Sequence, residues 1–196
     1  MTAYHDETEN LMASAPARKG NWMQTFTGRQ FWPADPRADE IDIRDIAHAL
    51  SMQCRYAGHC TQFYSVAEHC VLLANAIPEQ KLWALLHDAS EAYLVDVPRP
   101  VKPSLTGYAA LEDRIMAQVA IQFNLLPFTV TPAIVKDYDF RMLVDEKAQN
   151  MRPGLRWGSI DGLDPVGVTL QFWTPEQAEN EFLRVYFDLS RKELKK

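Results

Sequence analysis

Two neighbouring residues in an apolar stretch, His87 and Asp88, are the first candidates for chemistry in this sequence. Residues 82–86 before them are apolar, Glu91 follows one helical turn later, and Asp96 comes just past the expected helix end. Placing a histidine and a carboxylate in an apolar helix costs free energy unless a partner satisfies them. A divalent metal ion accepts both neutral imidazole and carboxylate oxygen, so this stretch predicts a metal site.

Two other helices offer further ligands. A turn at residues 77–78 would make the helix with His69 an antiparallel neighbour of the helix with His87, so that the two imidazoles can meet. Asp139 lies among apolar residues on a later helix, and Asp137, about 200° away round that helix, is the competing candidate. Two histidines and two aspartates would leave open positions on a metal, as a catalytic site requires.

The other two internal histidines are weaker candidates. His48 lies in a helix with an apolar face and fits a hydrogen-bonded core or surface histidine better than a ligand. His59 follows Gly58 in a loop, where it fits either a substrate contact or a structural hydrogen bond.

The elements that must position these side chains are mostly helical. Helices are expected over residues 43–53, 66–76, 78–95, 108–123, 132–151 and 175–191. Asp42 is a good N-cap, Pro78 suits a first helical position, and the segments 65–68 and 174–177 match the capping-box pattern. Residues 22–32 predict a short hairpin packed on the rest. The sequence therefore predicts an all-α, mostly helical bundle with one short N-terminal β-hairpin.

Length and composition bound the remaining possibilities. The chain has 196 residues, 47% of them apolar, which suits one domain over residues 21–196 after a loose polar tail at 1–20. A net charge of −6 argues against a nucleic-acid-coating protein but permits a local anion pocket. Cys54, Cys60 and Cys70 are expected to be reduced thiols, because they lack Cys-x-x-Cys spacing. Without a long apolar run or a signal-peptide pattern, a cytoplasmic protein without a membrane span is expected.

The combination of His69, His87-Asp88 and the distant Asp139 resembles the metal-binding signature of the HD-domain phosphohydrolases. Residues 87–91, Asp96, Pro98 and residues 100–102 are similar to the 5′-deoxynucleotidase branch. Segments 45–51, 55–59 and 63–69 look closer still to bacterial and phage HD hydrolases that include dATP triphosphohydrolases. The resemblance covers roughly residues 26–187, and it implies a helical HD fold and hydrolysis of nucleotides.

The resemblance also implies roles for individual residues. One divalent ion, zinc, cobalt or manganese, would be held by His69, His87, Asp88 and Asp139. Glu91 would position or deprotonate the attacking water, and Asp96 would orient that water or assist the leaving oxygen. The residues expected to face the substrate are Arg55, Tyr56, His59 and Lys102, of which the arginine and the lysine would hold phosphate oxygens.

Several alternatives stay open at this point. Water attack at the α-phosphorus would release a nucleoside together with phosphate or with triphosphate, and the sequence does not choose. Tyr56 stands where the deoxynucleotidase branch has a tryptophan that helps exclude the ribose 2′-hydroxyl, so sugar selectivity is open too. A second, weaker metal ion on the phosphates is a further alternative. Other hypotheses are an HD hydrolase of a signalling nucleotide or cyclic phosphodiester, and a catalytically silent nucleotide sensor. The partners expected are a nucleotide and a second copy of the chain, since the relatives are oligomeric.

Overall fold

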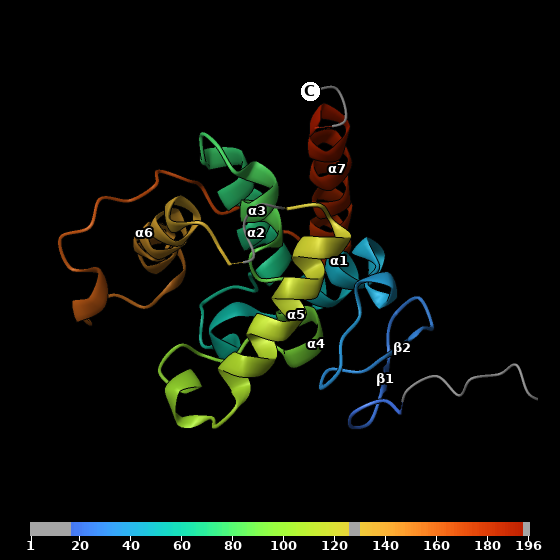
Figure 1. The fold of residues 1–196 in the computed structure, drawn as a ribbon. Helices are drawn as coiled ribbons and strands as arrows, with labels where there is room; N and C mark the ends of the chain where they lie inside the picture. The colour runs from blue at the N-terminus through green and yellow to red at the C-terminus, as the bar shows by residue number, and fades with distance from the viewer. Residues whose placement is uncertain (1–16, 126–129, 194–196) are drawn as a thin grey trace, which may run out of the picture.

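The fold is mostly helical with one short antiparallel hairpin near the N-terminus, as the sequence predicts (Figure 1). The computed structural model describes residues 17–125 and 130–193, so residues 1–16 of the tail predicted at residues 1–20 lie outside the described part. The strands and α-helices are β1 Met23–Gln24, β2 Gln30–Phe31, α1 Ile43–Met52, α2 Val66–Ala76, α3 Lys81–Leu86, α4 Glu91–Leu94, α5 Tyr108–Gln122, α6 Ala133–Asn150 and α7 Pro175–Glu193. Short 3-10 helices are η2 Ala38–Glu40, η3 Arg55–Gly58, η4 Lys102–Ser104 and η5 Gly158–Ile160.

Helix α2 is the centre of the packing, because it contacts α1, α3, α6 and α7. In Figure 1, α7 stands to the right of α2 and α3, and α6 lies to their left. Helix α5 crosses in front, below them. The core is apolar and includes Leu50, Val71, Leu85, Ile115 and Phe182, all with no exposed surface. Among the described residues, every helix is too short or too polar to cross a membrane.

The predicted helix starts at Asp42, Ser65 and Thr174 are confirmed, with one difference. The Asp42 carboxylate accepts from the Arg44 N–H, and the Thr174–Gln177 capping box forms in both directions. Ser65 Oγ accepts from the Glu68 N–H at 3.0 Å, but the Glu68 side chain does not return to cap Ser65.

Glu68 instead holds the segment that leads into α7. Its fully buried carboxylate accepts three backbone N–H groups, from Gln171, Phe172 and Trp173, at 2.7–2.9 Å. These three donors give the buried charge more compensation than a single capping bond would give. The neighbouring sequence predicts that Glu68 caps α2, but its carboxylate instead joins α2 to a segment about a hundred residues away.

The single helix expected over residues 78–95 is wrong, because the stretch divides into α3 and α4. Gln80 adopts a left-handed backbone with φ 55°, so α3 begins at Lys81 rather than at Pro78. Between the two helices the bonds tighten to i→i−3, with Glu91 N donating to the Asp88 carbonyl at 2.9 Å. His87 keeps helical dihedrals of φ −62° and ψ −29°, so the turn retains the direction of the chain.

The hairpin packs on α4 and α1, as a two-stranded ribbon must in order to be stable. Met23 pairs with Phe31 and Gln24 with Gln30. The Phe31 ring is fully buried and stacks on Tyr93 of α4 at 3.9 Å. Asp45 of α1 accepts from the backbone and hydroxyl of Thr27 in the turn between the strands.

Just before the hairpin, Arg18 lies within the stretch predicted as a loose tail, but it has fixed partners. Its guanidinium pairs with Asp35 and Glu40 and lies 4.1 Å above the Trp32 ring. The chain is therefore held against the domain from Arg18 onward.

Candidate functional site

Four side chains predicted as metal ligands converge from α2, the α3–α4 turn and α6. His69 Nε2 lies 3.4 Å from His87 Nε2 and 3.2 Å from Asp139 Oδ1. His87 Nε2 lies 3.2 Å from Asp88 Oδ2 and 3.8 Å from Asp139 Oδ1. His69 is completely buried, and the side chains of Asp88 and Asp139 are each 20% exposed. The cluster therefore has a protected inner side and an outer side open to a ligand.

Both imidazoles are fixed with Nε2 facing the cluster. His69 Nδ1 lies 2.7 Å from Glu146 Oε1, and His87 Nδ1 lies 2.8 Å from the backbone oxygen of Ala84. A carboxylate and a carbonyl only accept, so both Nδ1 atoms carry the hydrogen. In the neutral tautomers two Nε2 lone pairs then face each other beside two carboxylates, an arrangement that a cation would stabilise.

The separations within the cluster fit a divalent ion. Metal–ligand bonds of about 2.0–2.1 Å in tetrahedral geometry place ligand atoms about 3.4 Å apart. His69, His87 and Asp88 each offer an atom within 4.8 Å of the others, and Asp139 Oδ1 reaches both imidazoles. The imidazole and carboxylate donors suit zinc, cobalt or manganese. These four residues could therefore hold one ion and leave positions open to water and substrate.

Glu146 contacts His69 from outside the set of four candidate ligands, and the sequence analysis gave it no role. It lies two helical turns after Asp139 on α6 and is completely buried. Its Oε1 holds His69, while Oε2 accepts from Arg55 NH2 at 3.1 Å and from the Tyr56 hydroxyl. Burial opposes its ionisation, but Arg55 and His69 lower the pKa of Glu146 to about 2. The i, i+7 spacing from Asp139 is the signal that could have identified it.

Glu91 lies beside the cluster and has one unused oxygen. Its Oε1 accepts from Lys102 Nζ at 3.1 Å, whereas Oε2 is buried and has no hydrogen-bond partner among the described residues. Burial raises the pKa of Glu91 well above its ordinary value, and the charges of Asp88 and Asp96 act in the same direction. A buried carboxylate with a raised pKa and an oxygen without a partner takes up a proton more readily than an ordinary carboxylate.

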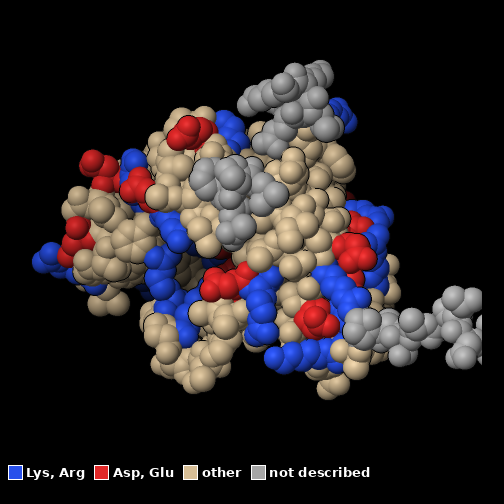
Figure 2. Space-filling view, viewed as in Figure 1, with Lys and Arg blue, Asp and Glu red and all other residues tan. Residues whose placement is uncertain are grey.

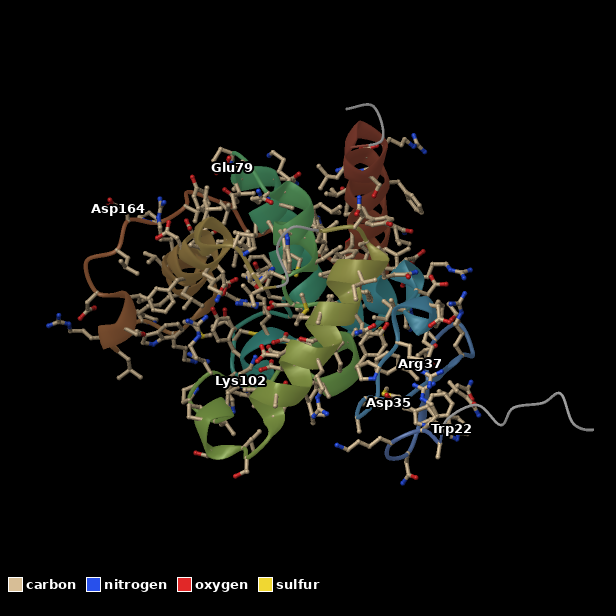
Figure 3. The ribbon with its side chains drawn as sticks, in the orientation of Figure 1. Trp22, Asp35, Arg37, Glu79, Lys102 and Asp164 are labelled. Carbon is tan, nitrogen blue, oxygen red and sulfur yellow. The ribbon has the colours of Figure 1, made fainter. Side chains whose placement is uncertain are left out.

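Lys102 is held from two sides. Besides Glu91, its ammonium group donates to Glu112 Oε1 of α5 at 2.8 Å, and Figure 3 shows Lys102 next to α5. Burial disfavours the charged form, but the two carboxylates raise the pKa of Lys102 above its ordinary value. A phosphate would therefore meet a fully charged lysine.

Strained backbone brings Asp96 towards the site. Val95 has φ 67° and ψ 157°, a conformation that costs a β-branched residue about 1–3 kcal/mol. The Tyr108 hydroxyl donates to the Val95 carbonyl, and the Asp96 N–H donates to Gln53 Oε1 at 2.8 Å. Gln53 also donates to the Glu91 carbonyl at 3.0 Å, so one amide fixes both ends of this segment. Burial raises the pKa of Asp96.

Arg55 and Tyr56, the predicted phosphate and sugar contacts, lie on the Asp88 side of the cluster. Arg55 is 8% exposed, and its NH1 is 3.7 Å from Asp88 Oδ2. Tyr56 has φ 59° and Ala57 has φ 51°, so η3 is a strained turn rather than a regular helix. The Tyr56 ring also lies 5.9 Å from the ring of Trp157.

Three other candidates lie apart from the cluster. His59 is exposed, and among the described residues its side chain makes no hydrogen bond. His48 bonds Glu179 of α7 at 3.0 Å and stacks on Phe26, as expected of a structural histidine. Asp137 is 61% exposed and pairs with Arg141. The structure therefore brings Asp139, and not Asp137, to the imidazoles.

The surface near the cluster combines both signs of charge. Figure 2 shows a hollow between α6 and α5 with acidic atoms inside it and a band of Lys and Arg along its α6 side. One cation in contact with the cluster is Arg99, whose Nη2 lies 3.2 Å from Asp139 Oδ2. An anionic ligand would approach between these cations.

The chain is a mostly helical protein in which two imidazoles and two carboxylates converge at one site. The chain is 36% identical to the uncharacterized protein YfdR of Escherichia coli over 173 residues, which span 87% of this chain and 96% of YfdR. It is 40% identical to the uncharacterized protein RCAP_rcc00048 of Rhodobacter capsulatus over 129 residues, 60% of this chain and 65% of that protein. No protein-family model matches the sequence. The chain belongs to the family of YfdR.

Proposed function

We propose that this protein is a divalent-metal-dependent phosphohydrolase of nucleotides, of the HD type that its motifs resemble. The observation that carries the proposal is the convergence of His69 Nε2, His87 Nε2, Asp88 Oδ2 and Asp139 Oδ1 beside a buried glutamate. A divalent ion bound there would polarise a phosphate and lower the pKa of a water. The reaction adds water across the bond between the α-phosphorus and O5′ of the nucleotide.

The residues around the cluster supply the remaining steps. Glu91 Oε2, buried and without a partner, takes the proton of the attacking water. Asp96, whose pKa burial raises, is placed to return a proton to the departing O5′. Lys102 and Arg55 stabilise charge on the phosphate oxygens. Nucleoside leaves with phosphate from a monophosphate, or with triphosphate from a nucleoside triphosphate.

A nucleotide panel tests the proposal. The protein is incubated with Co²⁺ or Mn²⁺ and deoxynucleoside mono- and triphosphates, ribonucleotides and cyclic dinucleotides, and the phosphorus products are identified by ³¹P NMR. Phosphate from monophosphates or triphosphate from triphosphates supports the proposal. Turnover of cyclic dinucleotides alone would assign the site to signalling-nucleotide hydrolysis. A metal-loaded protein inert towards the whole panel would leave the silent sensor in its place.

Glu91→Ala separates water activation from metal binding. We expect this variant to keep its metal affinity and lose about 10²–10⁴-fold in kcat, because it lacks the proton acceptor. Asp88→Ala should lose both metal and turnover. Glu79→Ala is the control, since Glu79 is exposed and lies away from Lys102 in Figure 3. If Glu91→Ala keeps most of its activity, Glu91 does not handle the water.

A further inference from the structure

Arg99 is an exposed cation in direct contact with the cluster. It lies on the loop between α4 and η4, and its side chain is 57% exposed. The guanidinium reaches across to α6, where NH2 donates to Asp139 Oδ2 at 3.2 Å and the group lies 5.0 Å above the Phe140 ring. The aromatic contact orients the guanidinium independently of the ion pair. The ion pair itself is solvent-exposed and contributes little to stability.

Two other cations near the cluster, Arg55 and Lys102, already pair with carboxylates. Arg55 is buried and bonded to Glu146, and Lys102 is shared between Glu91 and Glu112. Moving either one onto a ligand would leave a buried carboxylate without its partner, which is costly. If Arg99 moved to a ligand, it would give up only its contact with Oδ2 of Asp139, a carboxylate whose charge a metal ion can neutralise. Of these three cations, Arg99 can therefore change partner at the lowest cost.

Metal binding would change the surroundings of Arg99. Asp139 presents Oδ1 to the two imidazoles and Oδ2 to Arg99. With a divalent ion at Oδ1, the guanidinium would lie within a few ångströms of a double positive charge, and the two repel each other. An oxyanion between them would attract both, and a guanidinium binds phosphate oxygens through two parallel hydrogen bonds.

We propose that Arg99 is a substrate-binding residue that contacts a phosphate oxyanion once the divalent ion is bound. The inference rests on the proposed function, because it takes the substrate to be a nucleotide. The phosphate is either the one under attack or an outer phosphate of a triphosphate. Arg99 thus makes anion binding depend on the metal.

The test is anion binding by isothermal titration calorimetry, which needs no turnover. Inorganic phosphate and tripolyphosphate are titrated into Mn²⁺-loaded wild-type protein, Arg99→Ala, Arg99→Lys and Arg184→Ala. Arg184 is the matched control, because its side chain is 54% exposed and pairs with carboxylates on α7. We expect Arg99→Ala to bind anion at least about ten-fold more weakly, Arg99→Lys to recover part of this, and Arg184→Ala to match wild type. Mn²⁺ affinity should change less than the anion affinity.

The two anions distinguish the two positions. Equal losses for phosphate and tripolyphosphate place Arg99 at the attacked phosphate, and a loss confined to tripolyphosphate places it at an outer phosphate. The inference is overturned if Arg99→Ala binds both anions as Arg184→Ala does. It is also overturned if the variant loses Mn²⁺ affinity as strongly as anion affinity, because Arg99 would then only support Asp139.

The nucleotide panel separates this inference from the function on which it rests. Arg99-dependent anion binding in a protein that hydrolyses no nucleotide would overturn the proposed function alone. Nucleotide turnover and anion affinity that are both insensitive to Arg99→Ala would overturn the role of Arg99 alone.

Discussion

The proposed metal-binding side and the proposed substrate-facing side of this site are built differently. The four candidate ligands come from α2, the α3–α4 turn and α6, where the backbone is helical or nearly so and each imidazole has a second hydrogen bond. The substrate-facing residues lie on two irregular segments, with left-handed backbone at Tyr56 and Val95. The first side is formed by helix packing alone. The second depends on strained backbone and on cations that are paired with carboxylates.

The largest effect should follow from breaking the metal-binding side. Asp139→Asn removes a charged oxygen that lies 3.2 Å from His69 Nε2, whereas Asp137→Asn changes an exposed carboxylate on the same helix. Removing a residue that only hydrogen-bonds a metal ligand typically lowers metal affinity about 10–100-fold. We expect Asp139→Asn to lower Mn²⁺ affinity by more than this and to abolish turnover. Calorimetry with Mn²⁺ measures this, and equal affinities in the two variants would exclude Asp139 as a ligand.

A smaller effect, felt on both sides, should follow from Glu146→Gln. The change weakens the bond that fixes His69 and leaves buried Arg55 with only the more distant Asp88 carboxylate, at 3.7 Å, as a charged partner. We expect Mn²⁺ affinity to fall about 10–100-fold, and the free energy of unfolding to fall by about 3–5 kcal/mol. Glu179→Gln is the control, since Glu179 holds His48 in a similar bond away from the cluster. Urea unfolding measures the free energy of unfolding, and calorimetry measures the Mn²⁺ affinity. A fall in both for Glu146→Gln, but not for Glu179→Gln, would show that the two sides share this carboxylate.

The smallest effect should come from Asp42, which lies outside both sides. Hydrogen bonds from Arg44 lower the pKa of Asp42 to about 2 from an ordinary 3.8. A lowered pKa means that the ionised cap stabilises the fold above about pH 4 and that this stability is lost as the pH falls towards 2. Asp42→Ala should cost about 0.5–2 kcal/mol at pH 6 and less at pH 3, with Mn²⁺ affinity unchanged. A difference in unfolding free energy that stays constant between these pH values would contradict this account.

Local sequence signals predicted most of the helices. Asp42 and Ser65 set the starts of α1 and α2, because their side-chain oxygens satisfy backbone N–H groups of the next few residues. The start of α3 at Lys81 was not predicted, since it depends on Gln80 in a left-handed conformation and on Lys81 donating to the last carbonyls of α2. Such a turn is favoured by contacts with a neighbouring helix rather than by its own residues.

The residues of the site also divide into those that the sequence predicted and those that it did not. Residue type and position along the chain made His69, His87-Asp88 and Asp139 candidates, with Asp137 as a competitor, because polar groups in apolar helices need partners. The role of Glu91 came from the resemblance. The residues that hold the site's side chains and backbone in place were not predicted. These are Gln53, Glu112 and Glu146, which lie 10 to 91 residues along the chain from the groups that they hold. Their function depends on distances that appear only when the helices pack.

The sequence by itself determined that this chain is a mostly helical protein with histidines and carboxylates in apolar helices. Apolar periodicity and capping act over a few residues, so they can be recognised without a fold. Only the tertiary structure decided that Asp139 faces the imidazoles, that His59 stays exposed and that Arg99 reaches the cluster. The reason is physical, since a charged side chain takes its role from the charges within about 4 Å of it, and these come from distant parts of the chain.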